Sequence, residues 1–408
     1  MRNTILLIGA IILLTFYFCE KEPIFLKDNG TLPVVRLSID EKYLWSPDSG
    51  LYIKENYYQK WEFPAKIEYT EDGEQIFFED VGFRIKGRGS RRKSMKSFGI
   101  YWREEYGNKN LQYPMFPENQ TIKFKRLLLR NSGNDFGESH IKDGAISLII
   151  KNIANVEYRD YKPCVLYLND DYWGIYNIRE MITPHHFDYR YGVDDDNVDL
   201  LEGSEIHPVA DDGSIDDFEN EVIKFITEND LDDQENYNTF SDLIDIESYM
   251  DYIIVNSYIC NSDWPVGNAK WWRDKTSQNY TKWRWIVYDA DWSFDLKNID
   301  KVWIGDLYGK PYDDARKDGF YIFNNLVKNE EFKRRFLNRY LFFIENVFEK
   351  DRVEAIIKDS QSRIEAEYLN HQMKWDVLPK NKWNDLIDEL IEFNDKRHDL
   401  MKEIIESL

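Results

Sequence analysis

Strand-like segments occupy the first half of this 408-residue chain, and helical segments occupy the second half. In Val81–Lys86 apolar residues alternate with a period of two, and Ser97–Trp102 has the composition of an antiparallel partner strand. A second strand pair is expected where Cys164–Leu168 and Gly174–Ile178 flank the turn at residues 169–171. Strands that do not alternate with helices exclude a parallel sheet built from βαβ units. The pattern therefore predicts an α+β fold.

Helical periodicity dominates the second half of the chain. Ser241–Cys260 has the apolar spacing of one helix face, and three further segments follow it, with Pro379 separating the last two. Residues 193–221 are acidic and contain glycine, which predicts a long loop. We expect a β-rich amino-terminal lobe over residues 34–180 and a mostly helical carboxy-terminal lobe over residues 181–408. The three further helical segments are 330–349, 351–372 and 380–407.

Two short acidic motifs stand near the start of the helical half. Asp263 precedes Asn268 by five positions. Asp289 and Asp291 follow the strand-like run Trp283–Tyr288. Protein kinases place a catalytic base and the ligands of divalent cations in this pattern, because phosphoryl transfer needs a base at the acceptor hydroxyl and hard oxygen ligands for the cations. The spacing alone is not specific, since acidic pairs in an Asp-rich chain are commonly solvated loop residues.

A run rich in glycine and basic residues, Gly87–Lys93, lies between the strand-like segments Val81–Lys86 and Ser97–Trp102. Glycine lets a phosphate approach the backbone closely, and arginine or lysine neutralises the phosphate charge. The run lacks the third glycine of the Gly-x-Gly-x-x-Gly pattern and is not a Walker A loop, so a flexible basic turn is the alternative interpretation. The basic residues gathered here in an acidic chain are Lys86, Arg88, Arg91, Arg92, Lys93 and Lys96.

The amino terminus has the features of a targeting segment. Arg2 precedes the apolar run Ile5–Phe18, which has the length of a signal-peptide apolar region and is short for a membrane span. Cys19 follows at once, as in a bacterial lipoprotein signal, where it would be the lipidated first residue of the mature chain. An uncleaved anchor is the alternative. We expect residues 1–19 to be a signal peptide, residues 20–33 to be a tether, and the domain to lie outside the cytoplasm in the cell envelope.

Composition limits the partners of the chain. A formal net charge of −22 repels nucleic acid and anionic membrane surfaces. We therefore expect no nucleic-acid partner, and contact with a membrane only through the lipid anchor. Cys164 and Cys260 lie in apolar stretches, which favours two buried thiols and leaves a single disulfide open. The histidine and cysteine residues do not have the spacing of a zinc site.

Several stretches, taken in order, resemble the spore-coat protein CotH kinase family, a set of atypical secreted protein kinases. The matches are the basic hairpin, a strand pair that keeps Gly-x-Tyr before Glu180, and the two acidic motifs. The resemblance covers roughly residues 33–400 and implies a kinase-like, two-lobe architecture. The matching stretches are Gly82–Arg91, Lys96–Phe98, Leu166–Tyr176, Asn261–Asn268 and Asp289–Phe294.

The resemblance also implies roles for the acidic residues. Asp263 would be the catalytic base that accepts the proton of a Ser or Thr hydroxyl. Asn268 would help to hold a divalent metal ion. Asp291, or alternatively Asp289, would take the metal-binding role of the aspartate in the kinase Asp-Phe-Gly motif.

For the nucleotide, the resemblance implies that Lys96 approaches the phosphates with Arg88 and Arg91 nearby. An ordinary lysine at a strand end is the alternative for Lys96. Glu180 would lie at the hinge near the adenine or pair with a basic residue. Two acidic residues of an expected helix are further candidates for the partner of Lys96, namely Glu138 and Asp143.

The implied activity is that of a kinase that uses ATP with Mg²⁺ or Mn²⁺ to phosphorylate Ser or Thr of an unidentified protein substrate. A lipoprotein scaffold of the pseudokinase type, which binds a nucleotide or a partner without turnover, is the first alternative. A carbohydrate-active protein is the second, suggested by thirteen Trp residues and by acidic pairs that could act across a sugar. The sequence does not separate phosphoryl transfer from a related transfer of AMP.

Overall fold

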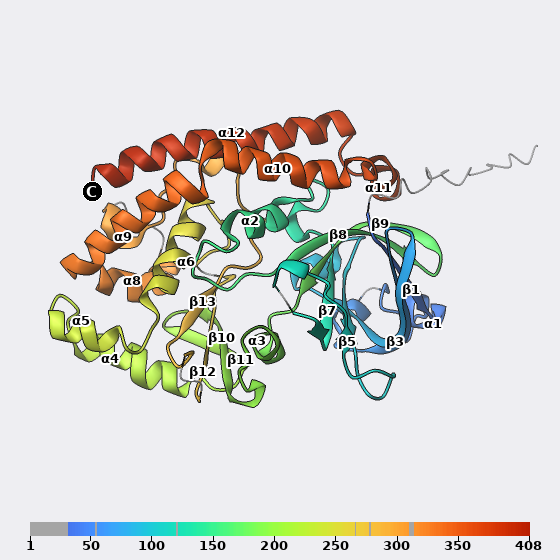
Figure 1. Cartoon of the computed structure of the whole chain (residues 1–408), viewed down its shortest axis with the longest axis horizontal. Helices are drawn as coiled ribbons and strands as arrows, with labels where there is room; N and C mark the ends of the chain where they lie inside the picture. Colours follow the sequence, from blue (N-terminus) through green and yellow to red (C-terminus); the bar gives the residue numbers. More distant parts are fainter. Residues whose placement is uncertain (1–31, 54, 120, 266, 277–278, 310–313) are drawn as a thin grey trace, which may run out of the picture.

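The computed structural model of the chain describes residues 32–408, apart from residues 54, 120, 266, 277–278 and 310–313. Figure 1 shows a β-rich lobe formed by the first part of the chain beside a lobe formed mainly of helices. The expected α+β, kinase-like two-lobe architecture is therefore confirmed. Cys19 and the predicted signal peptide lie outside the described residues. Within the described part of the chain, no helix has both the length and the apolar character that crossing a membrane requires.

Strands of the amino-terminal lobe form a closed barrel in the order β1-β2-β3-β4-β7-β9-β8. The two antiparallel pairs expected from the sequence are both present, as β3 with β4 and as β8 with β9. Alternation along β3 buries Val81, Phe83 and Ile85 in the barrel core. The strands are β1 (Val34–Ile39), β2 (Phe63–Glu71), β3 (Glu74–Lys86), β4 (Ser97–Tyr101), β7 (Arg126–Arg130), β8 (Tyr161–Leu168) and β9 (Asp171–Glu180).

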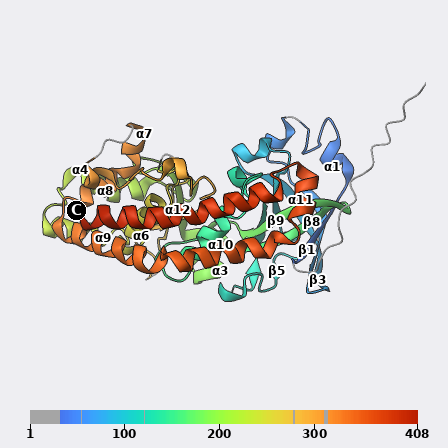
Figure 2. The same cartoon turned by 90° about the horizontal axis from the view of Figure 1, so that it is seen from above.

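Long helices cover one side of the carboxy-terminal lobe and reach the barrel. Figure 2 shows α10 and α12 lying along the length of the molecule, and α11 packs against β9. Side chains cap the first turns of α6 and α10; Asp245 accepts a hydrogen bond from Ser248 N, 2.9 Å away, at the start of α6. The helices used below are α2 (Lys142–Ile150), α3 (Pro184–Tyr191), α6 (Ile246–Tyr258), α10 (Lys350–Glu365), α11 (Tyr368–Trp375) and α12 (Lys380–Glu406).

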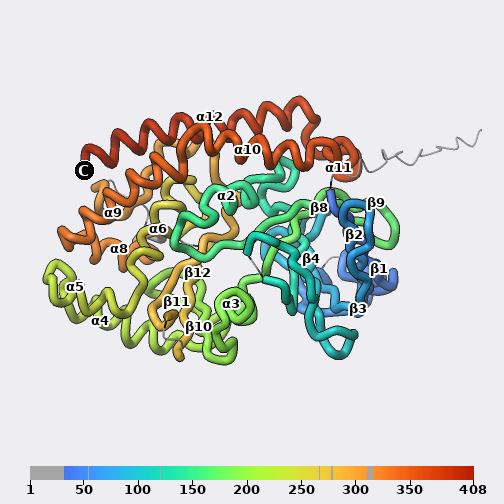
Figure 3. Tube along the Cα trace, in the orientation of Figure 1, coloured from blue at the N-terminus to red at the C-terminus, as the bar shows by residue number. Residues whose placement is uncertain are grey.

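The prediction of a long loop over residues 193–221 is wrong. The chain there forms β10 (Val198–Ser204) and β11 (His207–Asp212), which join β12 (Lys270–Asp274) and β13 (Arg284–Ile286) in a sheet of order β11-β10-β12-β13. Figure 3 traces the chain from β9 through α3 into this sheet. Leu200 pairs with Trp272, far away in the sequence. Local composition does not reveal such a strand, because its stability depends on a distant partner and on burial.

Each lobe has its own apolar core. The barrel core contains Cys164, and the core of the helical lobe contains Cys260. Both residues are buried free cysteines, so the interpretation as two buried thiols is confirmed.

A pair of buried histidines joins α11 to the barrel. His371 Nδ1 accepts a hydrogen bond from Ile175 N at 3.0 Å, and His140 Nε2 lies 2.9 Å from Ile175 O. The two imidazole rings lie 4.7 Å apart. Burial lowers the pKa of His140 to about 4 and holds the pKa of His371 well below its ordinary value. Both residues are therefore neutral in the folded protein at neutral pH.

Replacing His371 with asparagine tests this pairing through the pH dependence of stability. A group whose pKa is lowered by folding stabilises the protein above its unfolded pKa, and that stabilisation is lost as the pH falls. We expect His371→Asn to be less stable than the parent at pH 7.5, and the difference to shrink by about 1 kcal/mol at pH 5.5. Urea unfolding at both pH values measures the difference, with the exposed His207→Asn as control. A difference that does not change with pH would contradict the assignment.

Candidate active site

A cavity of about 1230 Å³ lies between the two lobes. The basic loop after β3 and the end of β7 line one side. The acidic residues picked out in the sequence line the other side, although more than twenty residues separate the first from the last. The four that meet here are Asp263, Asn268, Asp289 and Asp291.

The loop that carries Asp263 follows α6 and is anchored by its neighbour Trp264. The Trp264 side chain is fully buried, and its Nε1 donates a hydrogen bond to the Tyr252 hydroxyl at 2.7 Å. Gly267 N donates to Asp263 O at 2.7 Å and closes the turn. This anchoring places the half-buried Asp263 carboxylate at the cavity.

Asn268 and Asp289 both have left-handed backbone conformations, with φ of 54° and 56°. Asn and Asp tolerate this region better than most residues, and its cost is of the kind found at functional sites. Asn268 Nδ2 donates to Asp289 O at 3.1 Å and lies 3.4 Å from Asp263 Oδ2. One amide side chain thus ties the loop of Asp263 to the segment that carries Asp289.

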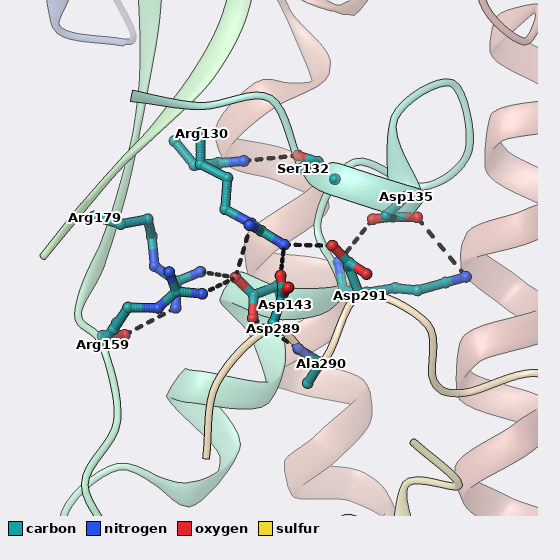
Figure 4. A network of polar contacts seen from close by, with 12 residues as sticks. Arg130, Ser132, Asp135, Asp143, Arg159, Arg179, Asp289, Ala290 and Asp291 are labelled. Carbon is teal, nitrogen blue, oxygen red and sulfur yellow. Dashed lines mark hydrogen bonds and ion pairs between the residues drawn. The ribbon is translucent and has the colours of Figure 1, made fainter. Parts of the chain in front are cut away.

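Arg130, the last residue of β7, joins the two aspartates of the second motif. Its Nη2 donates hydrogen bonds to Asp289 Oδ1 and to Asp291 Oδ2, as Figure 4 shows. Asp291 is buried, and its other oxygen accepts a hydrogen bond from Asn134 Nδ2 at 3.1 Å. The loop that contains Asn134 therefore fixes Asp291 from one side, while Arg130 fixes it from the other.

Asp143 in α2 lies at the centre of three buried arginines (Figure 4). Its Oδ2 is 2.6 Å from Arg179 Nη1, 3.3 Å from Arg159 Nη2 and 3.3 Å from Arg130 Nε. Burial opposes its ionisation, but the three guanidinium groups outweigh burial and hold the pKa of Asp143 well below its ordinary value. A buried carboxylate with several cationic partners is stable only as a set, so removal of one member leaves the others uncompensated.

For two of the acidic residues that line the cavity, Asp263 and Asp291, burial outweighs the groups that favour ionisation. It raises the pKa of Asp263, with nearby Asp289 adding to the shift and the Asn268 hydrogen bond opposing it. It raises the pKa of Asp291 to about 8, although Arg130 opposes this shift. Both carboxylates thus lie where additional positive charge would stabilise their ionised forms.

Cations line the outer face of the barrel above these aspartates. Strand alternation places Arg84, Lys86, Arg126 and Arg130 on this face, and the last three line the cavity. Gly99 makes room for Lys86, because a Cβ there would lie 2.9 Å from Lys86 Cγ. Burial and the neighbouring Arg84 lower the pKa of Lys86 to about 8. Within the described part of the chain, neither Lys86 nor Arg126 forms an ion pair.

Two of the three predicted phosphate ligands in and beside the basic loop line the cavity, and the third does not. Arg88 and Arg91 line the cavity. Lys96 is not among the described residues that line it. The Lys96 ammonium donates hydrogen bonds to Arg91 O at 2.6 Å and Lys93 O at 3.0 Å, and lies 4.6 Å from the centre of the Tyr57 ring. Lys96 therefore stabilises the loop through its carbonyl groups and does not line the cavity.

Glu180, at the end of β9, lies in a buried polar cluster beside the cavity. It accepts a hydrogen bond from Asp160 N at 3.0 Å and lies 3.4 Å from Arg190 Nη1. It also lines a smaller adjoining pocket that shares Met181 with the main cavity. Of the alternatives open for Glu180, pairing with a basic residue is the one observed. Glu138 pairs with Lys142 and Asp143 with arginines, so the expectation that one of them partners Lys96 is wrong.

Two residues of the site were missed by reasoning from sequence, namely Arg130 and Asp143. Arg130 ends a strand that reads as apolar, Leu127–Leu129, and only its position after this run marks it. Asp143 was considered for a different partner. A charged residue inside an apolar helix face indicates a buried ion pair, and this signal could have identified Asp143 as a buried, ion-paired residue from the sequence.

The donor set fits a divalent cation. Two carboxylate oxygens, from Asp289 and Asp291, converge on one nitrogen of Arg130, so they already surround a single positive charge. The Asn268 amide lies beside the Asp289 carbonyl and adds another oxygen-bearing group. Carboxylate and amide oxygens are the ligands that Mg²⁺ and Mn²⁺ prefer.

An aspartate, a cluster of oxygen ligands and a cationic face around one cavity are the features of a kinase-like protein. The family model described as CotH kinase protein matches residues 83–401. The chain belongs to the CotH kinase family. The match spans both acidic motifs, the basic loop and Arg130. A search of curated proteins finds no match to the chain.

Proposed function

We propose that this protein is an extracytoplasmic protein kinase that transfers the γ-phosphate of ATP to a Ser or Thr hydroxyl of a protein substrate. The convergence of four residues of the acidic motifs on a cavity that cations also line carries the proposal; the four are Asp263, Asn268, Asp289 and Asp291, and the cations include Lys86, Arg88 and Arg126. Membership of the CotH kinase family supports it.

In the proposed reaction, Asp263 accepts the proton of the substrate hydroxyl as the hydroxyl oxygen bonds to the γ-phosphorus. The bond between that phosphorus and the oxygen bridging to the β-phosphate breaks, and ADP leaves. Asn268 orients Asp263 through the contact of 3.4 Å between its Nδ2 and Asp263 Oδ2. Lys86, Arg88 and Arg126 attract the triphosphate to the opposite face of the cavity. A divalent cation held by Asp289, Asp291 and Asn268 would neutralise charge on the phosphates.

The pseudokinase alternative predicts binding without turnover. It does not require a carboxylate at the position of Asp263, because a base has no role in binding alone. The anchored loop and the oriented Asp263 side chain therefore favour a catalyst.

Label transfer from ATP tests the proposal. The purified protein is incubated with Mg²⁺ or Mn²⁺ and with ATP labelled either in the γ-phosphate or in the α-phosphate. A kinase transfers the γ label alone to protein. Transfer of the α label would mean transfer of AMP, and nucleotide binding with no transfer to itself or to a set of Ser and Thr peptides would favour the pseudokinase.

We also propose that the chain is anchored in the cell envelope through a lipid on Cys19. The support is the order of Arg2, the apolar run Ile5–Phe18 and the cysteine that follows. Cys19→Ser is expected to move the protein from the membrane fraction of the bacterial cell to the soluble fraction or to block its processing. A variant that stays in the membrane fraction with the processed mass of the parent would overturn the proposal.

A further inference from the structure

Kinases bind the nucleotide phosphates with a side-chain cation held in a fixed position. The resemblance implied Lys96 for this role, but the contacts of Lys96 and Arg130 favour Arg130. Lys96 is only 4 % exposed. Its ammonium donates hydrogen bonds to two carbonyl oxygens and lies against the Tyr57 ring. It faces its own loop, while Arg130 lines the cavity. To reach a phosphate, Lys96 would have to abandon both hydrogen bonds.

The position of Arg130 in the chain matches the role of a phosphate-binding cation. Protein kinases place the lysine that contacts the phosphates on the strand before a helix, and an acidic residue of that helix pairs with the lysine. Here α2 is the first α-helix after β7, and β8 and β9 follow it. Arg130 ends β7 and Asp143 lies in the first turn of α2. In the barrel, β9 lies between β7 and β8.

The contacts of Arg130 support this position. Its Nε faces Asp143 Oδ2 at 3.3 Å, and its Nη2 bonds Asp289 and Asp291. In the described part of the chain, Nη1 has no hydrogen-bond partner, although Arg130 lines the cavity. The guanidinium thus keeps a donor free for a phosphate oxygen while its other nitrogens hold it in place.

Asp143 also links α2 to the segment that carries the acidic motif. Its Oδ1 accepts a hydrogen bond from Ala290 N at 3.1 Å, and Ala290 lies between Asp289 and Asp291. Figure 4 shows this contact below Arg130. A shift of α2 would therefore move Arg130 and the two aspartates together.

Resting on the proposed function, we propose that Arg130 binds the nucleotide phosphates together with the other cations of the cavity, and that Asp143 is its positioning residue. Arginine differs from lysine here in keeping its charge when buried and in offering several donors in one plane. One side chain can therefore contact Asp143 through Nε and a phosphate through Nη1 at the same time.

Calorimetric titration of the whole protein with AMP-PNP and Mg²⁺ tests the proposal. Arg130→Gln is expected to weaken binding about tenfold or more, the value of a lost charged hydrogen bond, and Arg130→Lys is expected to recover part of the loss. Lys96→Met is expected to weaken binding less than Arg130→Gln does, because its ammonium donates to loop carbonyls and would affect the phosphates only through the loop. Arg339→Gln, which removes a partner of the buried Asp251, is the matched control, because neither residue is among the described residues that line the cavity.

The role of Asp143 is tested by a double-mutant cycle. Asp143→Asn is expected to weaken AMP-PNP binding, and the double variant with Arg130→Gln is expected to bind no more weakly than Arg130→Gln alone. Additive losses would assign Asp143 a general structural role. Thermal unfolding checks that each variant folds, and if Asp143→Asn does not fold, the comparison of Arg130→Gln with Arg130→Lys decides alone.

The outcomes separate this inference from the proposed function. If the parent binds AMP-PNP and Arg130→Gln binds equally well, the inference is overturned and the kinase proposal stands. If Lys96→Met loses binding while Arg130→Gln keeps it, the loop lysine is the phosphate ligand. If the parent itself does not bind AMP-PNP with either Mg²⁺ or Mn²⁺, both proposals fail.

Discussion

Asp263→Asn is expected to lower the rate of phosphoryl transfer by about 10²–10⁴-fold, the range for loss of a general base. The amide keeps the size of the side chain, and the anchor of the loop, Trp264, is unchanged. Affinity for the nucleotide and the midpoint of thermal unfolding should therefore stay close to those of the parent. Initial rates of γ-phosphate transfer to a set of Ser and Thr peptides measure the effect.

The matched control for Asp263 is Asp295→Asn, a nearby aspartate that accepts a backbone hydrogen bond from Lys297 N at 3.0 Å and is not among the described residues of the cavity lining. This variant should transfer phosphate at the parent rate. Equal rates for Asp263→Asn and the parent would remove Asp263 from the role of base. Loss of folding in Asp263→Asn would instead make the residue structural.

Gly133→Ala is expected to lower the transfer rate by about 10²-fold or more, the cost of misplacing a catalytic group by roughly 1 Å. A Cβ at Gly133 would lie 1.9 Å from Asp291 Oδ2 and 2.7 Å from Arg130 Nη2. Neither group has room to withdraw, because both are buried and hydrogen-bonded to each other. The methyl group must therefore displace Asp291 or Arg130. Transfer rates and Mn²⁺ affinity, measured by electron paramagnetic resonance, report the two effects.

Gly137→Ala separates the displacement of Asp291 from backbone strain. Gly133 and Gly137 both have positive φ, 61° and 84°, so alanine costs about 1 kcal/mol or more of stability at either position. A Cβ at Gly137 meets only Val377 Cγ1, at 3.7 Å. Gly137→Ala should thus lose stability but keep its transfer rate. If both variants lose transfer equally, strain is the cause, and the geometry around Asp291 is not.

The sequence was most informative where function depends on local pattern. The alternation in Val81–Lys86 predicted a strand that the structure shows, because one face of β3 must enter the barrel core. The spacing of Asp263 and Asn268 indicated a site loop, since both residues lie in the segment between α6 and β12. The two lobes follow from the separation of strand and helix periodicity along the chain.

Long-range pairing accounts for most of what the sequence did not reveal. The hairpin of β10 and β11 is stabilised by β12, about 70 residues later. Its exposed acidic residues make the apolar pattern of a strand hard to recognise in the sequence. Arg130 and Asp143 meet Asp289 and Asp291 only after β7, α2 and the segment after β13 come together. Lys96 was assigned to the phosphates from sequence, but its ammonium donates to a loop carbonyl. A basic loop in a sequence indicates positive charge, but it does not indicate where each side chain points.

Intact-mass spectrometry of the purified protein after incubation with ATP and Mn²⁺ or Mg²⁺, beside Asp263→Asn, tests the central claim most directly. We predict that the parent gains the mass of one or more whole phosphoryl groups and that Asp263→Asn gains none, while both bind the nucleotide. Equal gains in the two proteins would contradict the assignment of Asp263, and a gain equal to AMP would contradict phosphoryl transfer. A parent that binds nucleotide and modifies neither itself nor the Ser and Thr peptides would contradict the kinase activity.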